Sequence, residues 1–132
     1  ECQTILPKLK TDIVDILFAC CEGNLESINI EWHDEKSLCI VLCSKGYPDK
    51  HENNLPINNI EKIKLNNNEF IFHAGTKTQN NKVYSNGGRV LNFVVLSNSF
   101  KTSKDKATQL IKKLDWKKGY YRRDIGFKVI KS

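Results

Sequence analysis

Ser37-Leu38-Cys39-Ile40-Val41-Leu42-Cys43-Ser44 is the stretch of this chain that decides its fold. The run is short, partly β-branched and apolar on both faces of an extended backbone. It is followed by Gly46-Tyr47-Pro48, whose residues are typical of a turn. The pattern predicts a buried central strand around which the other elements are arranged.

Further strands are predicted after this one, because short apolar segments alternate with Asn-rich turns. The expected strands span residues 60–65, 69–73, 82–85 and 89–96, with turns at 66–68 and 80–81. The polar segment 49–59 contains Pro56 and is expected to form a loop across the mouth of a site. Strands that follow one another this closely indicate an antiparallel sheet.

Two main helices are expected beside the sheet. In the first, over residues 6–21, Pro7 suits the first turn and Gly23 suits the end, and one helical face carries Leu6, Leu9, Ile13, Ile16, Leu17 and Cys20. Thr102 or Ser103 can cap the second, with Asp105 in its first turn. Its inward residues would be Ala107, Leu110, Ile111 and Leu114, and residues 120–130 would close the fold as extended chain. The fold class is therefore α+β.

Length and charge restrict the classes of protein. The chain has 132 residues, which suits one ordinary domain, and a formal net charge of +6. Its lysines are scattered and mixed with Asp and Glu, which argues against a nucleic-acid surface. Glu1 opens a chain without methionine, so we expect a piece or a processed form of a longer protein.

Cysteine and histidine patterns exclude several kinds of site. The five cysteines form no Cys-x-x-Cys pair, and no secretory segment precedes them, so reduced thiols in a cytoplasmic protein are expected. His33, His51 and His73 stand apart from one another and from the cysteines, so no metal site is predicted. No apolar run is long enough to cross a bilayer.

Arginine is the unusual cation of this chain. Only three of the 21 cationic residues are arginines, and they are Arg89, directly after Gly87-Gly88, and the adjacent Arg122 and Arg123. A guanidinium group binds phosphate or carboxylate through two parallel hydrogen bonds, which a lysine ammonium cannot do. The arginines therefore either form an anion site or pair with acids such as Asp124. One of Arg122 and Arg123 is expected to bind ligand while its neighbour pairs with an acid.

The segment 72–77 is a second candidate for anion binding. Its small residues and Lys77 could present backbone N–H groups and a cation to an anion, or the segment could be an ordinary hairpin turn. His73 could transfer a proton or simply be held by a hydrogen bond. No Ser-His-Asp or Cys-His arrangement and no phosphate-binding loop is present, so no catalytic residue is assigned.

Taken in order, several motifs resemble the C-terminal part of the phosphoribosylamine–glycine ligase family, also called glycinamide ribonucleotide synthetases. The motifs are Glu1-Cys2-Gln3, Leu6-Pro7-Lys8-Leu9-Lys10-Thr11-Asp12, Glu31-Trp32, Gly46-Tyr47-Pro48, Phe72-His73-Ala74-Gly75-Thr76-Lys77, Asn86-Gly87-Gly88-Arg89-Val90-Leu91 and Tyr121-Arg122-Arg123-Asp124-Ile125-Gly126. Two departures from the family, Lys45 and the turn Gln79-Asn80-Asn81, do not fall on the arginines.

The resemblance implies an ATP-grasp ligase of purine biosynthesis, which joins glycine to 5-phosphoribosylamine through an acyl phosphate. ATP and Mg²⁺ would be bound upstream of Glu1, residues 1–23 would be the tail of the ATP-grasp domain, and 24–132 a C-terminal domain that caps the substrate. This fragment alone would be inactive. The candidates to bind the phosphate of phosphoribosylamine would be Arg89, one of Arg122 and Arg123, and Lys77. The alternatives are a phosphate- or RNA-binding module without catalytic activity, and arginines that only join the two domains.

Overall fold

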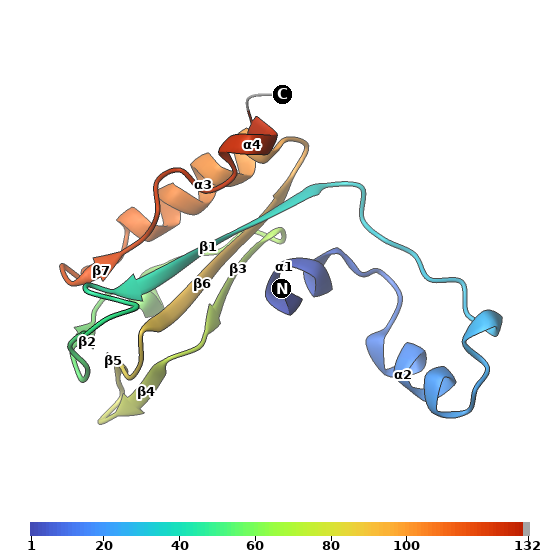
Figure 1. Cartoon of the computed structure of the whole chain (residues 1–132), viewed down its shortest axis with the longest axis horizontal. Helices are drawn as coiled ribbons and strands as arrows, with labels where there is room; N and C mark the ends of the chain where they lie inside the picture. Colours follow the sequence, from blue (N-terminus) through green and yellow to red (C-terminus); the bar gives the residue numbers. More distant parts are fainter. Residues whose placement is uncertain (131–132) are drawn as a thin grey trace.

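A four-stranded antiparallel sheet with one long helix on a single face forms the body of the molecule (Figure 1). The structure is a computed structural model and describes residues 1–130. Its strands are β1 (Lys36–Ser44), β3 (Glu69–His73), β6 (Arg89–Ser97) and β7 (Gly119–Tyr120), in the order β3-β6-β1-β7. β1 lies inside the sheet between β6 and β7, as predicted, and the expected α+β class is confirmed.

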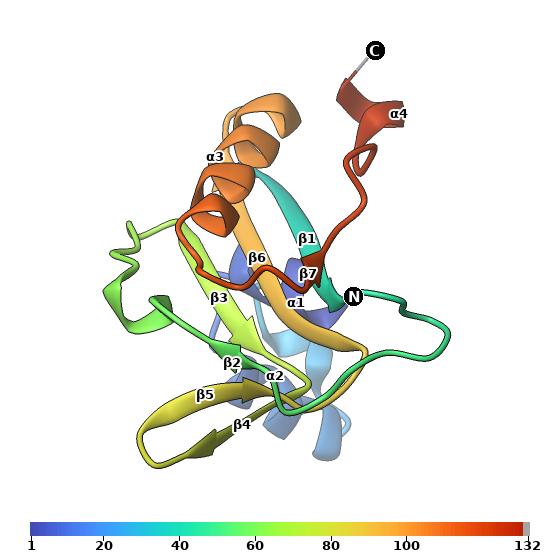
Figure 2. The same cartoon turned by 90° about the vertical axis from the view of Figure 1, so that its left-hand side faces the viewer.

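A second, smaller sheet lies beyond the end of the first (Figure 2). It contains β2 (Pro56–Ile57), β4 (Thr76–Gln79) and β5 (Lys82–Ser85), in the order β2-β5-β4. The predicted turn between residues 79 and 82 is confirmed, because Asn80 and Asn81 have φ values of 49° and 56°, which a two-residue hairpin requires. The chain thus forms two antiparallel sheets rather than the single one expected.

The main core lies between β1, β6 and the helix α3 (Phe100–Lys112). Alternate residues of β1, which are Leu38, Ile40 and Leu42, point into this core. From β6 and α3 the core includes Leu91, Phe93, Val95, Ala107, Leu110 and Ile111. The other face of β1 is only half-buried, at Cys39, Val41 and Cys43. The expectation that both faces of this strand are buried therefore holds for the α3 face alone.

The N-terminal helix differs from the prediction. In place of one helix over 6–21 the chain forms α1 (Cys2–Ile5), the 3-10 helix η1 (Leu6–Lys8) and α2 (Ile13–Cys21). Asp12 caps α2 by accepting a hydrogen bond from Val14 N at 2.8 Å, and Lys10 N donates to Glu31 O at 2.9 Å. A strong cap and an extended partner segment thus interrupt an apolar pattern that continues through both helices. Gly23, with φ of 69°, ends α2 as expected.

Three other boundaries were wrong. The segment 60–65 contains the short 3-10 helix η3 (Ile60–Lys62) and no strand. The helix α3 begins at Phe100 and is capped by Ser99, so neither Thr102 nor Ser103 is its cap, and Asp105 lies beyond its first turn. After β7 the chain turns through Gly126, with φ of 78°, into α4 (Phe127–Ile130), so residues 120–130 are not extended.

Replacing Ser99 with alanine is expected to lower the free energy of unfolding by about 1 kcal/mol, because the Ser99 hydroxyl accepts a hydrogen bond from Thr102 N at 3.1 Å and satisfies one free donor of the helix. Ser99→Asp keeps an acceptor and should restore most of the loss. Urea denaturation of the three proteins measures the effect. Equal stability of all three would show that Ser99 is not the cap.

Candidate functional site

Two cavities open on the sheet face opposite α3, and Val41, Tyr47 and Arg89 line both. The first, of about 410 Å³, is lined by these three and by Cys39, Cys43, Pro48, Tyr120, Tyr121, Arg122 and Ile125. The second, of about 740 Å³, is lined by them and by Glu1, Cys2, Gln3, Phe72, His73, Ala74, Gly88 and Asn92. Arg89 therefore stands where the two cavities meet.

Arg89 is exposed and is the first residue of β6. It pairs with Cys43 of β1 just after a shift in register. Within residues 1–130 the ion pairs join His33 to Glu35, Lys118 to Glu52 and Arg122 to Asp124, so no carboxylate of this part of the chain pairs with Arg89. Its guanidinium is free to bind an anion from either cavity.

Arg122 and Arg123 lie in different surroundings. Arg122 shares the first cavity with Arg89, but its Nε and Nη2 donate to the two carboxylate oxygens of Asp124 at 3.0 and 2.6 Å. This bidentate pair raises the pKa of Arg122 and holds the pKa of Asp124 below its ordinary value. Arg123 lines neither of the two cavities with Arg89 and borders a separate hollow formed by residues 119–124. The structure thus brings Arg89 and Arg122 together.

Lys77 is not part of this group. It is an exposed residue of β4, opposite Tyr84 in the small sheet, and it lines neither cavity that contains Arg89. His73 ends β3 and does line the second cavity, where its Nδ1 lies 2.9 Å from Thr76 Oγ1. The His73 ring is therefore held by a hydrogen bond at the edge of the site.

The glycines beside Arg89 serve packing between chain segments. Gly87 and Gly88 do not use the left-handed region, because the glycines with positive φ within the described residues are Gly23, Gly46 and Gly126. A Cβ on Gly88 would overlap the Tyr47 ring, and one on Gly75 would lie 2.7 Å from Arg89 O. The lack of a side chain thus lets the Tyr47 ring pack against Gly88 and lets the backbone of Arg89 pack against Gly75.

Sequence reasoning missed Asn92 and Tyr47. Asn92 is a single amide within the apolar run of β6, and its polarity there was the available signal. Tyr47 was taken only as part of a turn, although its ring lines both cavities. Its place depends on contact with Gly88, a residue far along the chain, which no local pattern indicates.

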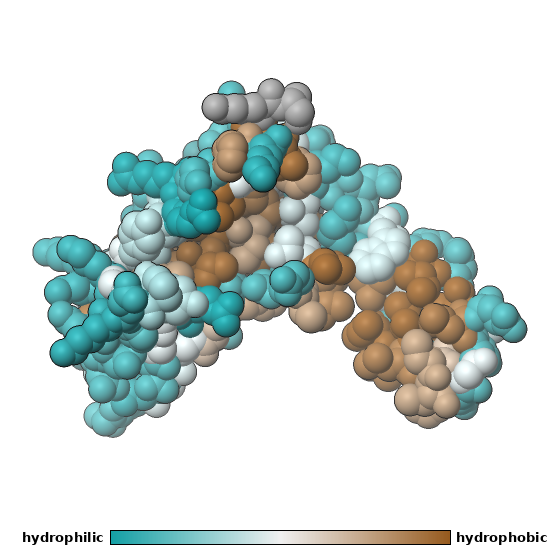
Figure 3. Space-filling model, viewed as in Figure 1, coloured by the Kyte–Doolittle hydropathy of each residue, from teal (hydrophilic) through white to brown (hydrophobic). Residues whose placement is uncertain are grey.

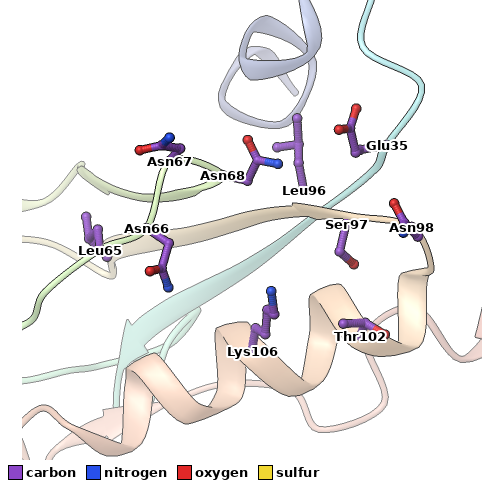
Figure 4. A pocket seen from close by; sticks show the side chains of 10 residues that line it. All are labelled: Glu35, Leu65, Asn66, Asn67, Asn68, Leu96, Ser97, Asn98, Thr102 and Lys106. Carbon is purple, nitrogen blue, oxygen red and sulfur yellow. The ribbon is translucent and has the colours of Figure 1, made fainter.

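The described residues offer few other sites. Across residues 1–130, no three His, Cys, Asp or Glu side chains are grouped so that they could hold a metal ion, and no helix is long and apolar enough to cross a membrane. Burial raises the pKa of the Cys39 and Cys43 thiols, which keeps them neutral. A polar cavity of about 660 Å³ lies near the start of α3, between Asn66 and Lys106, but no arginine lines it (Figure 4).

Known proteins resemble this chain in sequence and structure. Residues 37–128 match the family described as phosphoribosylglycinamide synthetase, C domain. The phosphoribosylamine–glycine ligase of Caldanaerobacter subterraneus subsp. tengcongensis is 39% identical over 95% of this chain and 29% of its own length. The phosphoribosylamine–glycine ligase of Agrobacterium fabrum is 38% identical over 98% of this chain and 30% of its own length. In the crystal structure of the Thermotoga maritima enzyme, the similar part has a TM-score of 0.61 and 27% identity, and covers 83% of this chain and 27% of that one.

Proposed function

Because the chain belongs to the phosphoribosylglycinamide synthetase C-domain family, we propose that it is part of a ligase that joins glycine to 5-phosphoribosylamine at the expense of ATP, and that this domain holds the sugar phosphate. The chain spans about 30% of the length of the curated relatives described above, so the complete reaction is assigned to a longer protein. Their names also favour a ligase over the alternative of an RNA-binding module.

The observation that carries this proposal is the guanidinium of Arg89, free of any carboxylate of residues 1–130 and open to two cavities. A phosphate dianion accepts two parallel hydrogen bonds from such a group. Holding the phosphate fixes the distant amine of the same molecule, and such positioning is worth several kcal/mol, up to about 7–11 in favourable cases. Arg122 borders the first cavity and would add a second positive charge.

The charge distribution of the larger cavity also suits this substrate. Arg89 and Glu1 both line it, so it offers a cation and a carboxylate to one ligand. Phosphoribosylamine carries a phosphate at one end and an amine at the other. Residues of opposite charge thus border one cavity, as a ligand with a phosphate and an amine requires.

An exposed apolar face on the N-terminal segment supports the proposed division after residue 23. Val14, Leu17 and Phe18 of α2 are 60%, 56% and 66% exposed, and they form part of an apolar patch away from the sheet (Figure 3). We assign this face to contact with the upstream ATP-grasp part. Hydrogen bonds between residues 8–11 and 29–33 would then join the two parts across the division.

In the proposed reaction, ATP and Mg²⁺ would activate the glycine carboxylate in the upstream part of the longer protein. The full-length protein is expected to release ADP only when both glycine and phosphoribosylamine are present, whereas residues 1–132 alone should release none. A coupled ADP assay on both proteins tests this. A rate of ADP release that is the same with and without phosphoribosylamine would contradict the proposed reaction.

A further inference from the structure

The side chain of Asn92 is a polar group in apolar surroundings. It lies in the middle of β6, where Val41 of β1 and Phe72 of β3 are its partners in register. Cys39 and Val94 follow on the same sheet face, so the neighbours of Asn92 within the sheet are apolar or thiol groups, while Gln3 and His73 line the same cavity. Only 8% of Asn92 is exposed.

Within residues 1–130 no hydrogen bond joins the Asn92 side chain to another group, and its amide atoms are not sealed from solvent, because the one fully buried unpaired side-chain atom of these residues is Trp116 Nε1. An amide without a protein partner adds little to the stability of the fold, and an apolar side chain would suit its neighbours in the sheet better. The amide does border the 740 Å³ cavity that also contains Arg89. This combination points to a ligand in the cavity that completes the hydrogen bonds of the amide.

We propose that Asn92 binds the ribose hydroxyl groups of a pentose phosphate whose phosphate is held by Arg89. This inference rests on the proposed function, because it takes the phosphate site at Arg89 as given. An amide both donates and accepts hydrogen bonds, which matches neighbouring hydroxyl groups. Three residues of a strand separate the two positions by roughly 10 Å between Cα atoms, and the long Arg89 side chain can shorten that span to the length of a sugar phosphate.

In this arrangement the two side chains bind different parts of the ligand. Arg89 recognises the phosphate, whichever molecule carries it, and Asn92 recognises the sugar. Inorganic phosphate and ribose 5-phosphate therefore separate the two contacts. The affinity for a ligand that lacks the sugar should not depend on Asn92.

The test uses the full-length protein and compares the binding of ribose 5-phosphate with that of inorganic phosphate by calorimetry. Asn92→Ala is expected to weaken binding of ribose 5-phosphate about tenfold, the value of one to two hydrogen bonds, and to leave the binding of phosphate unchanged. Asn98→Ala, at an exposed amide just after β6, is the matched control and should change neither.

Asn92→Val separates a binding role from a structural one. Because valine suits a strand with apolar neighbours, this variant should unfold at the same or a higher temperature while it loses the preference for ribose 5-phosphate. A lower unfolding temperature together with equal losses for both ligands would show a structural role and overturn the proposal. Unchanged binding of ribose 5-phosphate in both variants would overturn it as well.

Failure of the phosphate site is a separate result. If Arg89→Lys leaves the binding of phosphate unchanged while Asn92→Ala still weakens binding of ribose 5-phosphate, the sugar contact stands and the assignment of Arg89 falls. If Arg89→Lys weakens the binding of both ligands and Asn92→Ala weakens the binding of neither, the phosphate site at Arg89 stands and the sugar contact at Asn92 falls.

Discussion

Replacing Arg89 with lysine in the full-length protein is expected to raise the KM for phosphoribosylamine by about 10- to 100-fold and to leave the KM for ATP unchanged. Lysine keeps the positive charge but loses the paired N–H donors, and hydrogen bonds that involve charged groups are worth about 1.5–3 kcal/mol each. The effect should appear in KM, because the contact is made in the bound substrate before the chemical step.

Steady-state kinetics with each substrate varied in turn measure this effect. Arg122→Lys is the informative comparison, because the Arg122 guanidinium is already held by Asp124 and should contribute less. Lys112→Ala, at an exposed position of α3, is the neutral control. A parallel rise in the KM for ATP and for phosphoribosylamine would indicate that Arg89 maintains the fold or joins domains.

Replacing Gly88 with alanine is expected to reduce both stability and substrate binding. The new methyl group would overlap the ring of Tyr47, which must move, and such overpacking costs about 1–3 kcal/mol. Tyr47 lines both cavities beside Arg89, so its movement changes the site directly. We therefore expect a lower urea midpoint together with a higher KM for phosphoribosylamine.

Gly23→Ala is the control for this substitution. No atom lies within 4 Å of a Cβ built on Gly23, and its positive φ alone costs an L-residue about 1–2 kcal/mol. That variant should lose stability without a change in KM. If Gly88→Ala binds substrate as well as the unchanged protein, the contact between Tyr47 and Gly88 does not shape the site.

The strands were predictable where the local pattern and the burial agree. β1 and β6 are short, apolar and bounded by turns, and the Asn-Asn turn between β4 and β5 has the residues that positive φ favours. The break between α1 and α2 was missed because the apolar period continues across it. Asp12 was a readable capping signal, but the pairing of residues 8–11 with 29–33 was not, because it joins distant segments.

The site was predictable in part. The rarity of arginine singled out Arg89 and Arg122, which the fold brings to one cavity. Lys77 was added to them from the segment 72–77, although it lies on the small sheet, because spacing along the chain does not show on which sheet a strand will pair. Asn92 was not predicted, because its polarity within an apolar strand does not show that it borders a cavity with Arg89, which only the fold reveals.

The most direct test of the central claim is a ³¹P NMR titration of ribose 5-phosphate with the full-length protein and its Arg89→Lys variant. The unchanged protein should show a bound phosphate resonance, and the Arg89→Lys variant should lack it at the same concentrations. A bound resonance with the same shift and the same affinity in both proteins would contradict the claim that Arg89 holds the phosphate.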